Sequence, residues 1–214
     1  IAGLLAEREL IVKEAHHRMK NDLTVVRSFL SLQAAQSSSE VVHESLSVAS
    51  TRVGVMASIY EQLYRGSNLH AVDAATFVPG IVADTQAAVA LTGLEIEIDV
   101  EPRELTARLS VAVGILVNEL ITNAAKHAFA GIDNPRISVE ARSGDNRRFD
   151  LSVTDNGIGF AESQLGGKAL GGEHEGLGMT IVRALVDQHD GSVSLENRGG
   201  ASVRMSFPLG DSDD

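Results

Sequence analysis

The sequence predicts an α+β fold: an N-terminal hairpin of two antiparallel helices, followed by helices packed against a mixed, mainly antiparallel sheet. Two observations predict the hairpin. Residues 3 to about 37 lack proline and space their apolar side chains helically, and a second helically spaced segment ends at Leu63. A third observation predicts the sheet, because segments of alternating apolar and polar residues appear from residue 94 onward, between further helical patterns.

Each of the two N-terminal helices carries one apolar stripe. On the first helix the stripe recurs at intervals of three and four residues: Val12, Ala15, Met19, Leu23, Val26 and Leu30. On the second helix the spacing is typical of a coiled coil: Val42, Leu46, Ala49, Val53, Met56, Tyr60 and Leu63. The polar triplet Ser37–Ser39 predicts the turn between them. A two-helix hairpin buries such stripes poorly, so we expect a four-helix bundle made by a homodimer. Packing against the following domain is the alternative.

The remainder of the chain alternates between helical and strand-like patterns. Helices are expected at 73–91, 109–129 and 177–189, and strands at 94–100, 136–142, 148–154, 192–197 and 201–208. The helices are expected to cover one face of the sheet. A glycine-rich loop at 157–176 lies between the third expected strand and the last helix, and we expect it to be mobile without a ligand. The segment Arg65–Asn68 breaks the helical pattern, which predicts two domains, 1–67 and 68–214.

Composition excludes several classes of function. The chain has 18 basic and 29 acidic residues, a net charge of −11, which disfavours direct binding of nucleic acid. It has no cysteine, which excludes disulfides and thiolate sites and fits a cytoplasmic location. No apolar run is long enough to predict a membrane segment. Because the sequence begins inside a helical pattern, we expect that an upstream sensor domain is missing from this chain.

Two adjacent histidines in the first helix differ in their expected orientation. At about 100° per residue, His16 lies roughly 60° from the apolar stripe and His17 roughly 160° from it. His16 is therefore expected at the helix seam as a structural side chain. His17 is expected on the outer face, where a neutral imidazole is a nucleophile near pH 7. A solvated polar face is the alternative interpretation of this cluster.

The long helix expected at 109–129 carries a polar face suited to a bound metal and phosphate. Its polar side chains fall within about 80° of one another on a helical projection: Glu119, Asn123, Lys126 and His127. Glu119 and Asn123 offer hard oxygens to Mg²⁺, which keeps water and substrate phosphates as its other ligands. Lys126 supplies a positive charge for phosphate. An amphipathic helix with a solvated face is the alternative.

Two glycine-containing segments complete a predicted nucleotide site. The strand at 148–154 ends in Asp155, whose carboxylate is expected to accept a hydrogen bond from the adenine amino group, and Gly157 and Gly159 let backbone approach the ring. Guanine has an acceptor at the equivalent position, so this arrangement favours adenine. Gly176, Leu177 and Gly178 lead into the last helix, whose free N-terminal amides are expected to bind phosphate oxygens. No dinucleotide or P-loop motif is present.

Together these segments resemble sensor histidine kinases. NELITNAAKH is similar to the N-box, DNGIGF to the first glycine box and GLGMTIV to the second glycine box of the GHKL ATPase fold of histidine kinases, gyrases, Hsp90 and MutL proteins. HHRMKN, with LSLQA after it, resembles the His-box of the HWE-related subfamily of two-component sensor kinases. The resemblance covers about residues 10 to 208. It implies a dimerisation and histidine phosphotransfer domain at 1–67 and an ATP-binding catalytic domain at 68–214.

The resemblance also implies roles for individual residues. His17 would be the phosphoacceptor, Asn123 would hold Mg²⁺ with Glu119 nearby, and Lys126 and His127 would contact phosphates. Asp155 would recognise adenine, while the pocket and its lid would be shaped by Gly157, Gly159, Gly176, Leu177 and Gly178. The cofactors implied are ATP and Mg²⁺. The partner implied is the receiver domain of a response regulator, whose aspartate takes the phosphoryl group.

The sequence departs from the family pattern at two points. Most histidine kinases have an acidic residue directly after the phosphoacceptor, but Arg18 stands here, which leaves Glu14 as a candidate base. The chain has no tryptophan, so the Trp-x-Glu element of strict HWE kinases is missing. Three other functions stay open: a phosphotransfer relay with a non-catalytic ATP domain, a GHKL ATPase switch, and a net phosphatase of the partner. The intact glycine boxes disfavour the relay, and the His-box disfavours the ATPase switch.

Overall fold

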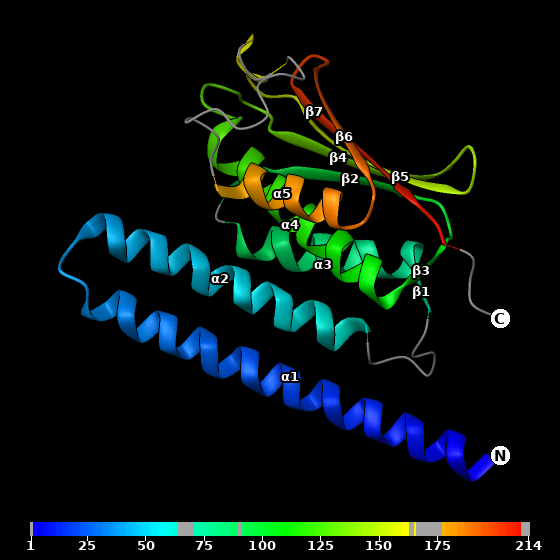
Figure 1. The fold of residues 1–214 in the computed structure, drawn as a ribbon. Helices are drawn as coiled ribbons and strands as arrows, with labels where there is room; N and C mark the ends of the chain where they lie inside the picture. Colours follow the sequence, from blue (N-terminus) through cyan, green and yellow to red (C-terminus); the bar gives the residue numbers. More distant parts are fainter. Residues whose placement is uncertain (1, 64–70, 90, 163–164, 166–176, 211–214) are drawn as a thin grey trace. The chain divides into compact units, whose positions relative to one another are not determined.

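A computed structural model of the chain describes residues 2–63, 71–89, 91–162, 165 and 177–210 (Figure 1). The chain divides into two compact units, Ile1–Ala71 and Val72–Asp214. The first unit is helical and the second combines three helices with two sheets. Within these residues, five helices and a mainly antiparallel main sheet confirm the predicted α+β class.

The first unit is the predicted helical hairpin. Helix α1 (Ala2–Gln36) and helix α2 (Glu40–Leu63) run side by side, joined at Ser37–Ser39 (Figure 1). The serines close the turn themselves, because the Ser37 amide donates to the Ala34 carbonyl at 3.1 Å and the Ser39 amide donates to the Ser37 hydroxyl at 3.2 Å. Side-chain oxygens of serine commonly stabilise such turns.

The two helices pack along one narrow line. Ala34 on α1 and Ile59 on α2 are buried, and Ser31 Oγ lies 2.7 Å from Ser50 Oγ across the hairpin. Part of the predicted stripe stays exposed, including Met19 and Val26. The reason is geometric: two helices in contact bury one line each, and an apolar surface wider than that line needs a further partner.

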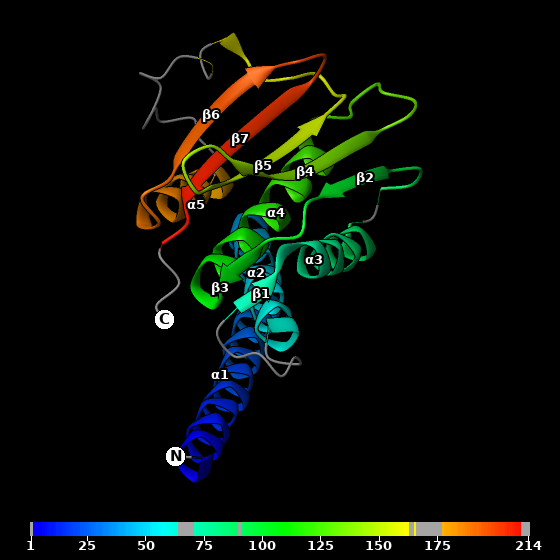
Figure 2. The same cartoon turned by 90° about the vertical axis from the view of Figure 1, so that its right-hand side faces the viewer.

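The second unit contains a five-stranded sheet in the order β2-β4-β5-β7-β6. Its strands are β2 (Glu95–Val100), β4 (Arg136–Gly144), β5 (Arg148–Asp155), β6 (Ser192–Asn197) and β7 (Ala201–Pro208). Strand β2 runs parallel to β4 and every other pair is antiparallel. Helices α3 (Ala74–Ala88), α4 (Ala107–His127) and α5 (Leu177–Gln188) all lie on one side of this sheet (Figures 1 and 2).

The core of this unit forms between those helices and the inner face of the sheet. Alternate residues of the central strands are buried: Ile137, Val139 and Ala141 on β4, Phe149, Leu151 and Val153 on β5, and Val203, Met205 and Phe207 on β7. The residues between them are polar, as expected for an antiparallel sheet with one solvated face. The same alternation directs Asp155, two residues after Val153, toward the helical side of β5.

Two short strands were absent from the sequence prediction. Strand β1 (Ala71–Asp73) and strand β3 (Glu104–Thr106) form a separate two-stranded sheet. Each strand is followed directly by a helix. Asp73 caps α3 by accepting from the Ala75 amide at 3.3 Å, and Thr106 caps α4 by accepting from the Leu109 amide at 3.3 Å. Thr106 explains why α4 begins before the predicted residue 109.

Among the described helices, only α4 is long and apolar enough to span a bilayer, and 72% of its most apolar window is buried inside the unit. Burial of this kind identifies α4 as the core helix. Most of the glycine-rich loop expected to be mobile, at 157–176, lies outside the described residues, as does Gly176.

Candidate nucleotide-binding site

The polar face of α4 divides between the core and a pocket. Asn118 is buried and its Oδ1 accepts from the Thr85 hydroxyl of α3 at 3.3 Å, so it is a structural group between two helices. Glu119 is only 3% exposed. Asn123 and His127, one and two turns further, line the pocket. Lys126 is exposed and does not belong to the lining. The polar side chains that were predicted to form one group on α4 therefore differ in how deeply they are buried.

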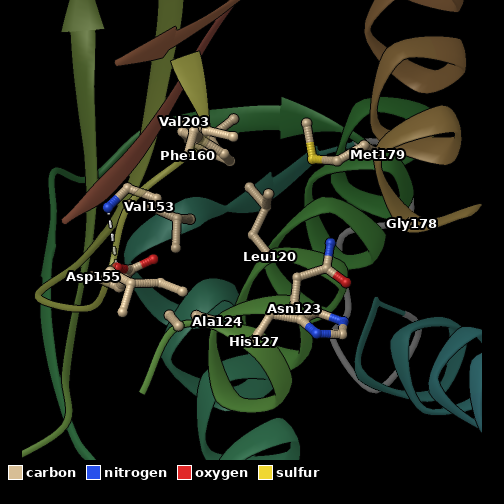
Figure 3. A pocket seen from close by; sticks show the side chains of 15 residues that line it. Leu120, Asn123, Ala124, His127, Val153, Asp155, Phe160, Gly178, Met179 and Val203 are labelled. Atoms are coloured by element: carbon tan, nitrogen blue, oxygen red, sulfur yellow. Dashed lines mark hydrogen bonds between the residues drawn. The ribbon is translucent and has the colours of Figure 1, made fainter. Parts of the chain in front are cut away.

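Asp155 ends strand β5 with one carboxylate oxygen fully engaged. Its Oδ1 accepts from the Gly157 amide at 2.9 Å. The same oxygen accepts from the Ala201 amide at 3.0 Å (Figure 3). These two donors fix the orientation of the carboxylate. No residue in the part of the chain that the structure describes donates a hydrogen bond to Oδ2, so this oxygen is available as an acceptor toward the pocket that Asp155 lines.

The glycines after Asp155 are required by neighbouring protein atoms. A Cβ on Gly157 would lie 2.6 Å from the Ala128 Cβ and would overlap the Ala128 carbonyl, which accepts from the Ile158 amide at 2.9 Å. Gly159 has φ +75°, a conformation that side chains other than glycine rarely adopt. The sequence analysis predicted that these glycines let the backbone approach the base closely. In the structure Gly157 lets the strand end pack against the C-terminus of α4, and Gly159 lies close to Asn197.

The N-terminus of α5 meets the polar face of α4 at Gly178. A Cβ there would lie 2.8 Å from Asn123 Nδ2, 3.0 Å from Asn123 Oδ1 and 3.1 Å from Glu119 Oε2. The absence of a side chain therefore lets the first turn of α5 approach both groups. The amides of a helix N-terminus lack intrahelical acceptors and favour anions. The arrangement brings backbone amides that can donate hydrogen bonds to phosphate, and two candidate metal ligands, to one end of the pocket.

These elements enclose a pocket of about 530 Å³. Asp155 lies on the sheet side, whereas Asn123, Gly178 and Met179 lie on the helix side, with Leu120 between them (Figure 3). The rest of the lining is mostly apolar: Ala124, Ala128, Val153, Ile158, Phe160, Ala161, Ala201 and Val203, with His127 and Gly159. One end thus presents apolar side chains and a carboxylate, and the other presents polar groups. That division suits a nucleotide, which has an aromatic base and a charged tail.

The structure brings together only some of the predicted site residues. One cavity is lined by Asn123, His127, Asp155, Gly159 and Gly178. Gly157 and Glu119 do not line it, but they lie against the lining residues Ala128 and Gly178, respectively. The side chains of His17 and Leu177 lie outside the described part of the chain. Phe160, Met179 and Val203 were not predicted as lining residues. The period-two pattern of β7 offered a signal for Val203 alone, because it places this side chain on the same face as Val153, its cross-strand partner.

Comparison with known protein families matches two consecutive regions. Residues 14–89 match the family described as "Histidine kinase". Residues 109–211 match the family described as "Histidine kinase-, DNA gyrase B-, and HSP90-like ATPase". The first region contains α2, α3 and most of α1, and the second contains the whole pocket lining.

Individual relatives agree with the family matches. The sensor histidine kinase PdtaS of Mycolicibacterium smegmatis is 29% identical over 96% of this chain and 41% of its own length. Blue-light-activated histidine kinase 2 of Erythrobacter litoralis is 23% identical over 92% of this chain and 56% of its own length. The chain therefore spans about half the length of these relatives.

A solved structure shares the fold. The histidine kinase domain of the Erythrobacter litoralis EL346 blue-light-activated histidine kinase superposes with a TM-score of 0.66, with 22% identity over 95% of this chain and 96% of that domain. Family matches, relatives and fold agree with the pocket and with the order of the motifs. The chain belongs to the HWE-related sensor histidine kinases of two-component systems and carries a GHKL-type ATPase domain.

Proposed function

We propose that this chain transfers the γ-phosphoryl group of ATP to its own His17 and then to an aspartate of a response regulator. Residues 1–67 would serve dimerisation and phosphotransfer, and residues 68–214 would bind ATP in the cytoplasm. The observation that carries the proposal is the orientation of Asp155. Two amides hold one carboxylate oxygen, and the other is available for the adenine amino group beside a mostly apolar lining.

The residues at the opposite end of the pocket fit a magnesium ion. Asn123 Oδ1 and Glu119 Oε2 approach the same point beside Gly178. Among the described residues, no group of three or more His, Asp or Glu side chains forms a metal cage. Mg²⁺ commonly takes one or two protein oxygens and completes its shell with phosphates and water. Asn123 would hold the ion with Glu119 beside it, and the ion would offset negative charge on the phosphates.

The transfer itself requires positioning and a route for one proton. A lone pair on the His17 imidazole forms the N–P bond as the bond from the γ-phosphorus to the bridging oxygen breaks, and ADP leaves with that electron pair. The imidazole then loses its ring proton. Glu14 is the candidate base, and its Oε1 accepts from Arg18 Nη2 at 2.6 Å. Arg18, which replaces the usual acid, would thus hold a carboxylate near the histidine. His127 and Lys126 would contact phosphates.

The second transfer and the assembly follow from the hairpin. The N–P bond breaks as a carboxylate oxygen of the response regulator forms the new O–P bond. The imidazole takes up one proton as the phosphoryl group leaves, for which Glu14 is the candidate donor, and this regenerates neutral His17. We propose that a second copy covers the hairpin, because one face of α1 exposes Val25, Phe29 and Leu32 at helical spacing. Phe29 is 60% exposed and Val25 is 67% exposed. Association would remove this apolar surface from water.

Incubation with γ-labelled ATP and Mg²⁺ tests the proposal. The parent should acquire label that is lost in acid and kept in alkali, as expected for a phosphohistidine, and His17→Ala should acquire none. Both proteins should bind ATP equally, because His17 lies in the other unit. Label that persists in His17→Ala, or a parent that binds ATP without acquiring label, would contradict autophosphorylation at this residue. The second result would favour the relay or the ATPase switch.

A further inference from the structure

The turn between β6 and β7 makes hydrogen bonds to residues of the nucleotide pocket at both of its ends. It runs from Asn197, the last residue of β6, to Ala201, the first residue of β7. The Arg198 amide donates to the Gly200 carbonyl at 2.8 Å and closes the turn. Only Ala201 lines the pocket directly. The sequence alone marks Arg198–Gly200 as a turn and assigns it no part in the site.

Asn197 holds one residue of the pocket wall by both of its backbone groups. Its Oδ1 accepts from the Phe160 amide at 2.8 Å, and its Nδ2 donates to the Phe160 carbonyl at 2.9 Å. Phe160 belongs to no helix or strand, so its backbone has no ladder partner of its own. The side-chain amide group of Asn197 supplies the two hydrogen bonds that the backbone of a neighbouring strand would otherwise supply.

The close approach of Asn197 depends on Gly159. A Cβ on Gly159 would lie 2.8 Å from Asn197 Oδ1 and 3.0 Å from its Cγ. Gly159 also has a positive φ, so glycine is required there for two reasons. Gly159, Phe160 and Ala161 all line the pocket, whereas Asn197 does not. Asn197 therefore fixes the position of this part of the pocket wall, although its own side chain does not line the cavity.

The other end of the turn supports Asp155. A Cβ on Gly200 would overlap the Asp155 carbonyl oxygen and lie 2.7 Å from its carbonyl carbon. Gly200 thus allows the turn to pack against the backbone at the end of β5. At this approach the Ala201 amide reaches Asp155 Oδ1 at 3.0 Å. One turn thereby sets both the wall beside the base and the carboxylate that would recognise it.

We infer that Asn197 is a positioning residue for nucleotide binding, acting through Phe160, and that the β6–β7 turn is part of the nucleotide site. The inference deepens the proposed function and rests on it. Losing both hydrogen bonds should release the Phe160 backbone without opening the core, because Asn197 is exposed. The consequence should appear in the affinity for ATP and not in the stability of the fold.

The test compares Asn197→Ala and Asn197→Asp with the matched control Arg198→Ala. Arg198 lies on the same turn, but its side chain pairs with Glu196 at 2.7 Å and does not line the pocket. Asn197→Ala should raise the Kd for ATP, measured by calorimetry, by about tenfold, as expected for two lost neutral hydrogen bonds. Asn197→Asp retains the acceptor and should lie between Asn197→Ala and the parent. Arg198→Ala should bind like the parent.

Three further readouts separate positioning from a structural defect. In Asn197→Ala the KM for ATP in autophosphorylation should rise while kcat stays within about twofold. The Phe160 amide should exchange its hydrogen faster, and the urea midpoint should match that of Arg198→Ala. Should Asn197→Ala not fold, Asn197→Asp alone decides, since parent-like affinity in a folded variant overturns the inference.

The outcomes distinguish this inference from the proposed function. A parent that binds no ATP overturns both. A parent that binds ATP, together with an Asn197→Ala variant that binds it equally well, overturns the inference and leaves the proposed function standing. Equal weakening in Arg198→Ala also overturns it, because the effect would then come from the turn in general and not from the bonds to Phe160.

Discussion

The orientation of Asp155 predicts that a single change of atom reverses the nucleotide preference. In Asp155→Asn the amide oxygen should take the position of Oδ1, because that position accepts from the amides of Gly157 and Ala201. The opposite orientation would place an NH₂ group against two donors. The variant therefore directs NH₂ toward the pocket in place of the free carboxylate oxygen. A donor then faces the adenine amino group, itself a donor, whereas guanine presents an acceptor at that position.

The magnitude follows from the cost of an unmatched polar group. Leaving a desolvated donor or acceptor without its partner costs about 1–3 kcal/mol. That range corresponds to a change in affinity of about 5- to 150-fold. The pocket is mostly apolar around Asp155, so water compensates little. We expect ATP to bind Asp155→Asn at least about fivefold more weakly than it binds the parent, and the ratio of GTP to ATP affinity to rise by more than that factor.

Competition titration of both nucleotides against parent and variant measures this ratio. Asp187→Asn is a matched control, because Asp187 is exposed on α5 and does not line the pocket. It should leave both affinities unchanged. If Asp155→Asn folds, binds a nucleotide and keeps the parental ratio within about twofold, the assignment of Asp155 to the base is wrong. Equal affinity of the parent for ATP and GTP would refute the same reasoning.

Four other substitutions test separate parts of the molecule. Asn123→Ala should abolish Mg²⁺-dependent autophosphorylation with an unchanged urea midpoint, because it removes a metal ligand from the pocket face of α4; retained activity would exclude that role. His17→Ala should lose the phosphoprotein, whereas His16→Ala should keep it and lower the urea midpoint, and mass spectrometry under alkaline conditions locates the phosphate. Burial, followed by the charge of Arg108, lowers the pKa of His189 below its ordinary 6.5, although Asp190 opposes the shift. The unfolded chain therefore binds this proton more readily, and the free energy of unfolding should fall as pH drops through 6.5 and below; His189→Gln should reduce that dependence in urea titrations, and an unchanged dependence would refute it.

Periodicity predicted the long elements and missed the short ones for a physical reason. Helix α4 and the central strands each present enough apolar residues at a fixed interval to reveal which face is buried. Strands β1 and β3 have three residues each, too few to establish a period. They exist because Asp73 ties the two segments together: its Oδ1 accepts from the Arg103 amide at 3.1 Å, and the Ala74 amide donates to the Arg103 carbonyl at 2.8 Å. Such a pairing between distant segments is invisible to a local pattern.

The site residues could be predicted where polar side chains recur on one face of a single helix. They could not be predicted where their role depends on packing between elements. A helical projection groups Glu119, Asn123, Lys126 and His127, but it carries no information about depth. The position of α5 buries Glu119 and the end of the helix exposes Lys126. Likewise, the sequence shows where a glycine is, but it does not show which distant residue the glycine contacts in the fold. Gly157 faces the Ala128 carbonyl, a contact between the strand end and the helix end that no spacing reveals.

The glycines explain how one pocket can be made from segments so far apart in the chain. Gly157 brings the end of β5 to the end of α4, Gly178 brings the start of α5 to Asn123, and Gly200 brings the β6–β7 turn to Asp155. In each case a Cβ would meet backbone or a polar site group at less than 3 Å. Each contact joins a pocket group to an element that belongs to the core or the sheet. The polar groups are therefore held by rigid parts of the fold, and their orientation precedes binding, which lowers the entropy lost when a nucleotide enters.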